Sequence, residues 1–109
     1  MMKELKNEVE KDIKSELARA NVVHPLFGSR HEGLAVIAEE VFEVAKEMDR
    51  LARTFNIFRY NVFNDEYESL IGDVAAMKET ATNLACEAIQ VAAMCEKWEL
   101  GSRDSKVEE

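Results

Sequence analysis

The chain has 109 residues, a formal net charge of −8 and 47% hydrophobic residues, which fits one globular domain rather than a disordered chain. An acidic chain is repelled by nucleic-acid backbones and by anionic membranes, so we expect neither DNA, RNA nor a membrane as a partner. Four glycines and one proline are too few for the turns of a β-rich fold, and they predict an all-α protein with long helices.

The cysteines and the N-terminus indicate a cytoplasmic location. Cys86 and Cys95 lie nine residues apart, on different sides of a helix, and form no C-x-x-C pair. The start of the chain is charged and lacks the apolar segment of a signal peptide. No apolar run approaches the roughly 20 residues that span a bilayer.

The first helix is predicted over residues 3–20, and a linker follows it. Four apolar residues recur every four positions on this helix: Leu5, Val9, Ile13 and Leu17. Pro25 and Gly28 mark the linker over residues 21–30. Its end reads as a capping box, because Ser29 precedes Glu32 by three residues. A second helix should therefore begin at Arg30 or His31.

The second helix carries a regular apolar seam with alternating spacings of three and four residues. The seam consists of Leu34, Ile37, Val41, Val44, Met48, Leu51, Phe55, Phe58 and Val62. This pattern predicts one continuous helix to about Val62, packed in the manner of a coiled coil. An end near Arg53 is the alternative, because residues 54–64 are poor helix formers.

A turn at Asn64-Asp65 separates this helix from a third, predicted over residues 66–100. The third seam consists of Tyr67, Leu70, Val74, Met77, Ala81, Leu84, Ala88, Val91, Cys95 and Trp98. Gly101-Ser102 is expected to end the helix. We therefore predict a single domain over residues 1–100, followed by a disordered charged tail over residues 101–109.

The third helix is apolar on a second side, which indicates an oligomer. This second strip contains Ile71, Ala75, Ala85, Ile89 and Ala92, and a helix apolar on two sides needs more than one neighbour. The first helix is too short to cover two helices of about 45 Å. We expect a long antiparallel hairpin plus an N-terminal helix, assembling into a homodimer or homotetramer with a four-helix-bundle core.

Acidic residues border both seams. Glu39, Glu40 and Glu43 form an E-E-x-x-E pattern, and the face shared by Glu40 and Glu43 also includes Glu47. The third helix carries a matching line of Asn83, Glu87 and Gln90. Like charges held close beside a seam favour a cation between them.

The hairpin register brings these two lines together. A turn centred on residues 64–66 pairs residues whose numbers add to about 130. Glu43 then faces Glu87, and Glu40 faces Gln90. Four oxygen-bearing side chains at one level suit Mg²⁺, or Mn²⁺, with open positions for a triphosphate. On an acidic chain of many glutamates, the same pattern also arises as a solvated helix face.

The acidic motifs resemble those of a known family. His31-Glu32-Gly33, Glu39-Glu40-Val41-Phe42-Glu43 and residues 87–94 (EAIQVAAM) are similar to the MazG-like branch of the all-α nucleoside triphosphate pyrophosphohydrolases. The resemblance covers about residues 27–98. It implies an all-α fold, dimers or tetramers, and Mg²⁺-dependent cleavage of nucleoside triphosphates to monophosphates and pyrophosphate.

The resemblance also implies roles for individual residues. Glu40 and Glu43 would bind the metal from the first motif and Glu87 from the second, while Glu39 would position water or a second ion. Gln90 stands where the family carries Asp. Its amide oxygen can bind a metal but adds no charge, so metal affinity and catalysis should fall. The two motifs also lie farther apart than in the family, which equal lengthening of both helices would explain.

Two functional hypotheses follow. In the first, the chain is an enzyme, a Mg²⁺-dependent nucleoside triphosphate pyrophosphohydrolase. Its candidate catalytic residues are Glu39 and Glu43, and its candidate metal ligands are Glu40, Glu43, Glu87 and Gln90. In the second, the chain is a non-catalytic helical oligomer that binds nucleotide, metal or protein on the same scaffold, which Gln90 favours.

Overall fold

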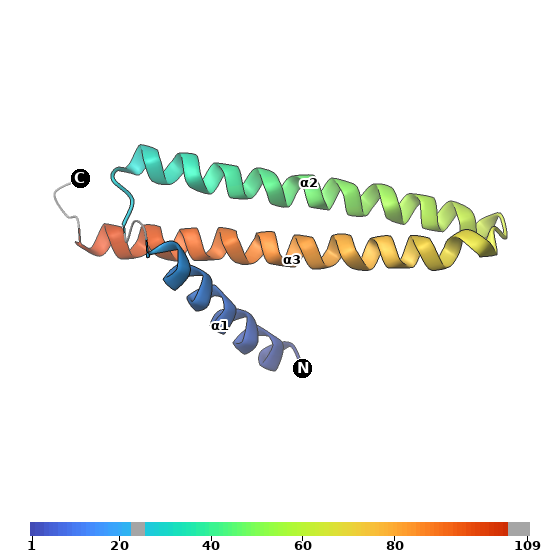
Figure 1. Cartoon of the computed structure of the whole chain (residues 1–109), viewed down its shortest axis with the longest axis horizontal. Coiled ribbons are helices and arrows are strands. Elements are labelled where there is room, and N and C mark those ends of the chain that lie inside the picture. The colour runs from blue at the N-terminus through green and yellow to red at the C-terminus, as the bar shows by residue number, and fades with distance from the viewer. Residues whose placement is uncertain (23–25, 105–109) are drawn as a thin grey trace. The chain divides into compact units, whose positions relative to one another are not determined.

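Three helices make up the computed structural model of the chain, which describes residues 1–22 and 26–104 (Figure 1). They are α1 (Met2–Ala20), α2 (Arg30–Phe63) and α3 (Tyr67–Asp104). No strand occurs within the described ranges, so the predicted all-α class is confirmed. None of the helices in these ranges is both long enough and apolar enough to cross a membrane.

Packing divides the chain into two compact units along α2 and α3. Unit 1 comprises Met1–Val41 and Ala88–Glu109, and unit 2 comprises Phe42–Glu87. Unit 1 thus holds α1 with the first part of α2 and the last part of α3. Unit 2 holds the remaining parts of α2 and α3 and the turn that joins them. The single domain over residues 1–100 stays a prediction.

Unit 1 contains the apolar core of the described chain. Its buried hydrophobic residues are Leu17 from α1 and Ala93 and Met94 from α3. Partly buried side chains surround them: Ile13, Ala20, Phe27, Val36, Ile37 and Leu100. The predicted apolar stripe of α1 is therefore used in its C-terminal half, whereas Leu5 remains exposed. At the edge of this contact, Lys14 Nζ lies 3.3 Å from Glu96 Oε1.

The start of α2 has the capping interactions that its sequence predicts. The backbone N–H of Glu32 donates to Ser29 Oγ at 3.1 Å, and the Glu32 carboxylate accepts from the Gly28 N–H at 2.9 Å. These bonds satisfy amides that lack partners inside the helix. The predicted residues 23–25 of the linker, including Pro25, lie outside the described residues.

Just after the cap, Gly33 permits a close contact in unit 1. A Cβ atom at this position would lie 2.6 Å from Trp98 Cε3 and 3.0 Å from Phe27 Cδ2. Carbon atoms cannot approach so closely without displacement, so the absence of a side chain lets the Trp98 ring lie against the α2 backbone. The ring of Phe27 also lies beneath the Lys97 ammonium, 4.9 Å from its centroid.

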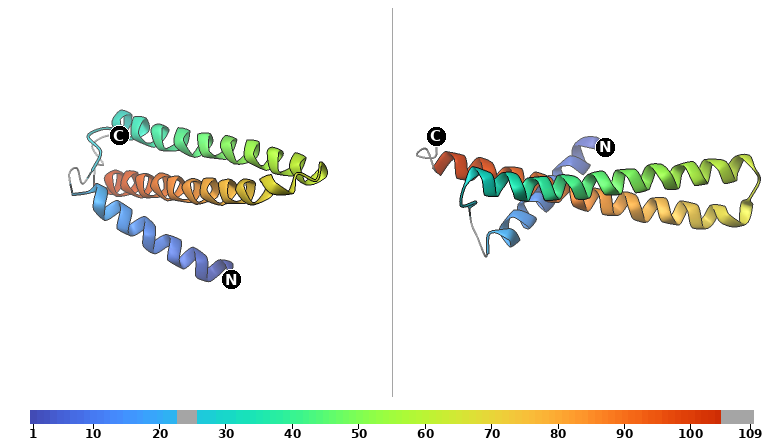
Figure 2. Two further views of the ribbon diagram at one scale, coloured as in Figure 1. Left: turned by 45° about the vertical axis from the view of Figure 1, so that its right-hand side comes forward. Right: turned by 90° about the horizontal axis from the view of Figure 1, so that it is seen from above.

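Unit 2 is an antiparallel helical hairpin, and both views of Figure 2 show its two helical segments side by side (green, then yellow and orange). The helix α2 continues to Phe63, so the alternative end near Arg53 is wrong. The turn falls at Asn64-Asp65 as predicted, and Asp65 has a left-handed backbone with φ of 55°. Asp tolerates this conformation better than most residues, which explains its place in the turn.

The predicted end of α3 is wrong. The helix runs to Asp104 rather than to Leu100, so residues 101–104 of the predicted disordered tail are helical. Gly101 keeps a negative φ, because no glycine of the described chain has a positive one. A glycine within a helix costs only about 1 kcal/mol relative to alanine, and here it does not stop the helix. The rest of the tail, residues 105–109, lies outside the described residues.

The predicted seams are correct at every second position only. On α2, Ile37, Val44, Leu51 and Phe58 are half-buried as expected. The other five predicted positions are between 42% and 62% exposed: Leu34, Val41, Met48, Phe55 and Val62. Their neighbours one residue earlier turn inward instead: Gly33, Glu40, Glu47, Thr54 and Asn61. On α3 the same shift exposes Tyr67, Val74, Ala81, Ala88 and Cys95 and turns Asp73, Thr80, Glu87 and Met94 inward.

Candidate functional site

The acidic motif of α2 spans the boundary of the two units. Glu39 and Glu40 belong to unit 1, and Glu43 belongs to unit 2. Glu39 is exposed and Glu40 is half-buried. Glu43 is exposed, and its Oε1 lies 3.2 Å from the Nζ of Lys46, one turn later on the helix. Two of the candidate acids are therefore open to solvent, and Glu40 borders the inner face.

The second motif is divided in the same way. Glu87 closes unit 2 and Gln90 belongs to unit 1. Both side chains are half-buried, as expected for residues that border a seam. They lie three positions apart on α3, so they share one side of this helix. Their oxygen atoms are of the type that Mg²⁺ accepts, although only Glu87 contributes a charge.

A side-chain hydrogen bond fixes the register of unit 2. Asn61 Nδ2 donates to Asp73 Oδ2 at 2.7 Å, and the two residue numbers add to 134. In the predicted register, the numbers of paired residues added to about 130. Side chains on both helices lean toward their own N-termini, so in an antiparallel pair the contacting residues have higher numbers than the level of their Cα atoms suggests. This direction explains the difference.

The same register places Glu47 of α2, rather than Glu43, at the level of Glu87 of α3. Burial agrees with this assignment, since Glu47 is only 8% exposed and Glu87 is half-buried. Thr54 and Thr80 form the next level toward the turn, and Thr80 is 6% exposed. The interior of unit 2 therefore alternates polar levels with apolar ones.

Glu47 is the candidate residue that the sequence did not assign. Its carboxylate pairs with the guanidinium of Arg50, one turn later, while most of the Arg50 side chain remains exposed. A carboxylate removed from water needs such a partner, because an unpaired buried charge is strongly unfavourable. The sequence already placed Glu47 on the face of Glu40 and Glu43. Its position four residues after Glu43 was the signal that could have identified it.

The candidate acids form no three-residue metal group within the chain. Across residues 1–22 and 26–104, no three His, Cys, Asp or Glu side chains come together in a way that could hold a metal ion. The donor chemistry of Glu40, Glu43, Glu87 and Gln90 suits Mg²⁺, but the arrangement in one chain does not fit a complete site. The magnesium site stays a prediction.

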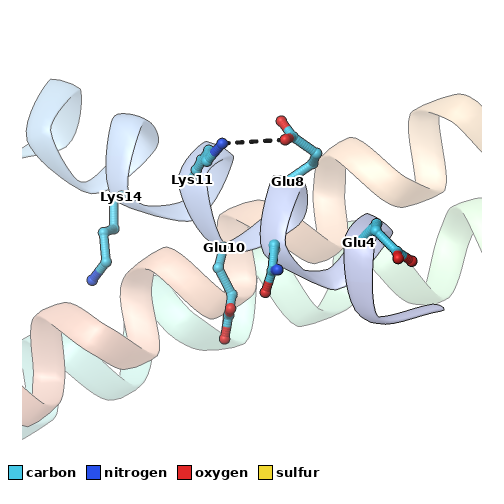
Figure 3. Close-up of a pocket in the computed structure, with 6 residues that line it drawn as sticks. Glu4, Glu8, Glu10, Lys11 and Lys14 are labelled. Carbon is cyan, nitrogen blue, oxygen red and sulfur yellow. Dashed lines mark hydrogen bonds and ion pairs between the residues drawn. The ribbon is translucent and has the colours of Figure 1, made fainter. Parts of the chain in front are cut away.

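Two hollows on unit 1 are lined by residues other than the candidate acids. One, of about 460 Å³, is lined by α1 alone, and Figure 3 shows its charged lining with the Lys11–Glu8 ion pair. The other, of about 440 Å³, lies between α1 and α3 and includes Ile13, Ala92 and Cys95. Neither hollow contains Glu39, Glu40, Glu43, Glu87 or Gln90. Both cysteines are free and exposed.

Comparison with known proteins does not assign the chain to a family. No protein-family model matches the sequence, and no curated protein or solved structure is significantly similar to it. The case for a function therefore depends on the acidic residues and on the hairpin that positions them.

Proposed function

We propose that the chain is the subunit of a Mg²⁺-dependent nucleoside triphosphate pyrophosphohydrolase, an enzyme that releases a nucleoside monophosphate and pyrophosphate. The observation that carries the proposal is the inward placement of two acids from different helices, Glu47 and Glu87, at one level of unit 2. Glu43 lies one turn from Glu47 on α2. A buried acid such as Glu47, level with the half-buried Glu87, contributes nothing to an apolar seam and costs stability.

The chemistry requires a cation as well as carboxylates. A triphosphate is repelled by a chain with a net charge of −8, and Mg²⁺ or Mn²⁺ would bridge the two negative groups. In the proposal, Glu40, Glu43, Glu87 and Gln90 would supply oxygen atoms to the metal, and Glu47 would add the carboxylate that the register places level with Glu87. Glu39 and Glu43 would hold the attacking water. The water oxygen bonds to the α-phosphorus, a carboxylate accepts the water proton, and the bond from this phosphorus to pyrophosphate breaks.

The proposal includes an assembly of identical chains in the cytoplasm. A homodimer or homotetramer with a four-helix core would cover helix faces that one chain leaves exposed. Sixteen large hydrophobic residues are exposed among the described residues. A second chain would also bring further acids near those of the first. The incomplete acidic group of a single chain is thus compatible with an assembled site.

Pyrophosphate release tests the proposal. We expect a panel of nucleoside triphosphates with Mg²⁺ or Mn²⁺ to yield pyrophosphate, and Glu43→Gln to lower kcat/KM by about 100-fold. Glu79→Gln is the matched control, because Glu79 is an exposed acid on α3 within unit 2. Absence of pyrophosphate with every nucleotide, together with no rise in Tm on adding the metal, would contradict the proposal.

The Gln90 position offers a second test of the metal. Gln90→Asp restores the charge that the resemblance leads us to expect, and we predict about tenfold tighter Mg²⁺ binding. Isothermal titration of both proteins with Mg²⁺ measures this change. Equal Mg²⁺ affinities of the two proteins would show that residue 90 does not bind the metal.

The second candidate is a non-catalytic helical oligomer that binds nucleotide, metal or protein. Two observations favour it: an uncharged Gln90 in the second motif, and the lack of a three-residue metal group among the described residues. This candidate predicts a metal- or nucleotide-dependent rise in Tm without any pyrophosphate release. The same assays therefore distinguish the two functions.

A further inference from the structure

Unit 2, all of whose residues are described, has no fully buried hydrophobic side chain. The buried hydrophobic residues of the described chain, Leu17, Ala93 and Met94, all belong to unit 1. The buried side chains of unit 2 are those of Glu47 and Thr80. The apolar levels inside this hairpin, which include Leu51, Phe58 and Leu84, are only half-buried. The hairpin alone therefore removes little apolar surface from water, and burial of another surface would add stability.

That surface is an exposed apolar face on both helices of unit 2. On α2 it consists of Met48, Phe55 and Val62, which recur every seven residues. On α3 it consists of Tyr67, Val74 and Ala81, with the same interval. A repeat of seven on both helices is the pattern by which long helices pack side by side over many turns.

We propose that this face of unit 2 is the docking surface for a second copy of the chain, with α2 of one copy packed against α3 of the other. The inference deepens the proposed homo-oligomer by naming the surface and the helix pairing. It does not depend on nucleotide hydrolysis. A second copy is the occupant because the two helices of unit 2 complement each other in charge and in side-chain size.

The charges of the two helices are opposite. Residues 42–63 of α2 contain four basic and three acidic residues, whereas residues 67–87 of α3 contain one basic and four acidic residues. Three of the four basic residues of α2 pair with acids on the same helix, so this segment has a net charge of +1, whereas the α3 segment has −3. Packing α3 on α3 would therefore bring like charges together. The pairing of α2 with α3 of the other copy places opposite net charges side by side.

Side-chain sizes on the two helices also match. The α2 face presents Met48 and Phe55, both large. The α3 face presents Ala81, and the exposed Ala85 lies one turn further along the helix. The size match applies to this end of the face, because Tyr67 and Val74 are larger. Small residues opposite large ones allow two helices to approach closely and interdigitate.

The face also offers apolar surface that a partner could cover. Met48, Phe55 and Val62 are between 42% and 56% exposed, and Tyr67 and Val74 are 69% and 48% exposed. A second copy packed on unit 2 would remove this apolar surface from water.

Measurement of mass against concentration tests the inference without nucleotide or metal. We expect the unaltered chain to be at least a dimer at micromolar concentration, and Phe55→Glu to weaken association by about 100-fold or more. Tyr60→Glu is the matched control, because Tyr60 is an exposed aromatic residue on the opposite side of α2. Its association should equal that of the unaltered chain. Circular dichroism checks the helix content of each protein.

Mixing two variants tests the helix pairing. Phe55→Lys and Ala81→Glu should each associate weakly alone, and their equimolar mixture should regain dimers because one lysine faces one glutamate. If Phe55→Glu is not helical at any concentration, Ala81→Glu replaces it in the measurement of mass against concentration, and the same loss of association is expected. A helical, monomeric unaltered chain would overturn the inference, as would variants that associate as tightly as the control. Failure of the mixture to regain dimers would overturn the pairing of α2 with α3.

Discussion

The two units use the same pair of helices in opposite ways. In unit 1, α2 and α3 join α1 around Leu17, Ala93 and Met94, with Trp98 lying against Gly33. In unit 2, the same helices turn Glu47, Thr80 and the Asn61–Asp73 hydrogen bond toward each other and leave Phe55 and Val74 exposed. The difference comes from α1, which packs against α3 in unit 1 only. A hairpin without a third element keeps its most apolar face outside.

The largest expected effect is a cavity in the core of unit 1. Met94→Ala should lower the free energy of unfolding by about 3 kcal/mol, because it removes a buried side chain from an otherwise packed cluster. Thermal unfolding followed by circular dichroism measures the loss. Met48→Ala is the control, since Met48 is exposed in unit 2, and its loss in a monomeric sample should be below about 1 kcal/mol. Equal losses of unfolding free energy in the two variants would show that the packing of Met94 in unit 1 is no tighter than that of Met48 in unit 2.

A smaller effect of opposite sign is expected in unit 2. Glu47→Leu replaces a buried carboxylate by an apolar side chain and should raise the free energy of unfolding by about 1 kcal/mol. The same change should abolish pyrophosphate release, because Glu47 lies level with Glu87 in the proposed site. Glu43→Leu, at an exposed position, should give no gain in stability. A destabilised Glu47→Leu protein would show that the Glu47–Arg50 pair on α2 contributes more stability than an apolar side chain at this position.

The smallest effect concerns the edge of the α1 contact. Lys14→Ala removes the ion pair between Lys14, which is largely exposed, and Glu96. It should lower the free energy of unfolding by less than about 0.5 kcal/mol. Urea unfolding at low and high salt measures the difference, which should vanish at high salt because exposed charges are screened. Lys11→Ala, which removes the pair with Glu8 within α1, is the control. A loss above 1 kcal/mol would mean that charge, rather than Leu17, attaches α1.

Local signals predicted the helices well. Ser29 and Glu32 located the start of α2, and Asn64-Asp65 located the turn, because both depend on hydrogen bonds and backbone angles within a few residues. Gly101 misled the prediction of the α3 end, since a glycine also fits inside a helix. Such signals do not depend on which chain segments pack together.

The inner faces could not be predicted in the same way. A seam with alternating spacings of three and four residues is compatible with two inner faces of the helix. Both faces contain the same residues at every seventh position, such as Leu51 and Phe58, and they differ in the residues between them. Hydropathy favoured the choice with Met48 and Phe55, whereas the helices of unit 2 pack with Glu47 and Thr54 between them. An apolar pattern indicates which face of a helix is covered, but it does not indicate which chain segment covers that face. Glu47 was therefore left unassigned, and Glu43 was placed too far inside.

The contact of Trp98 with Gly33 gives the two units separate optical signals. Trp98 is the single tryptophan of the sequence, and it belongs to unit 1. The two tyrosines, Tyr60 and Tyr67, both belong to unit 2, where they are exposed. Indole fluorescence therefore reports on the packing of unit 1, and tyrosine absorbance reports on the surface of unit 2. The unaltered chain thus carries one natural chromophore type in each unit, and the order in which the units open during unfolding can be followed without any label.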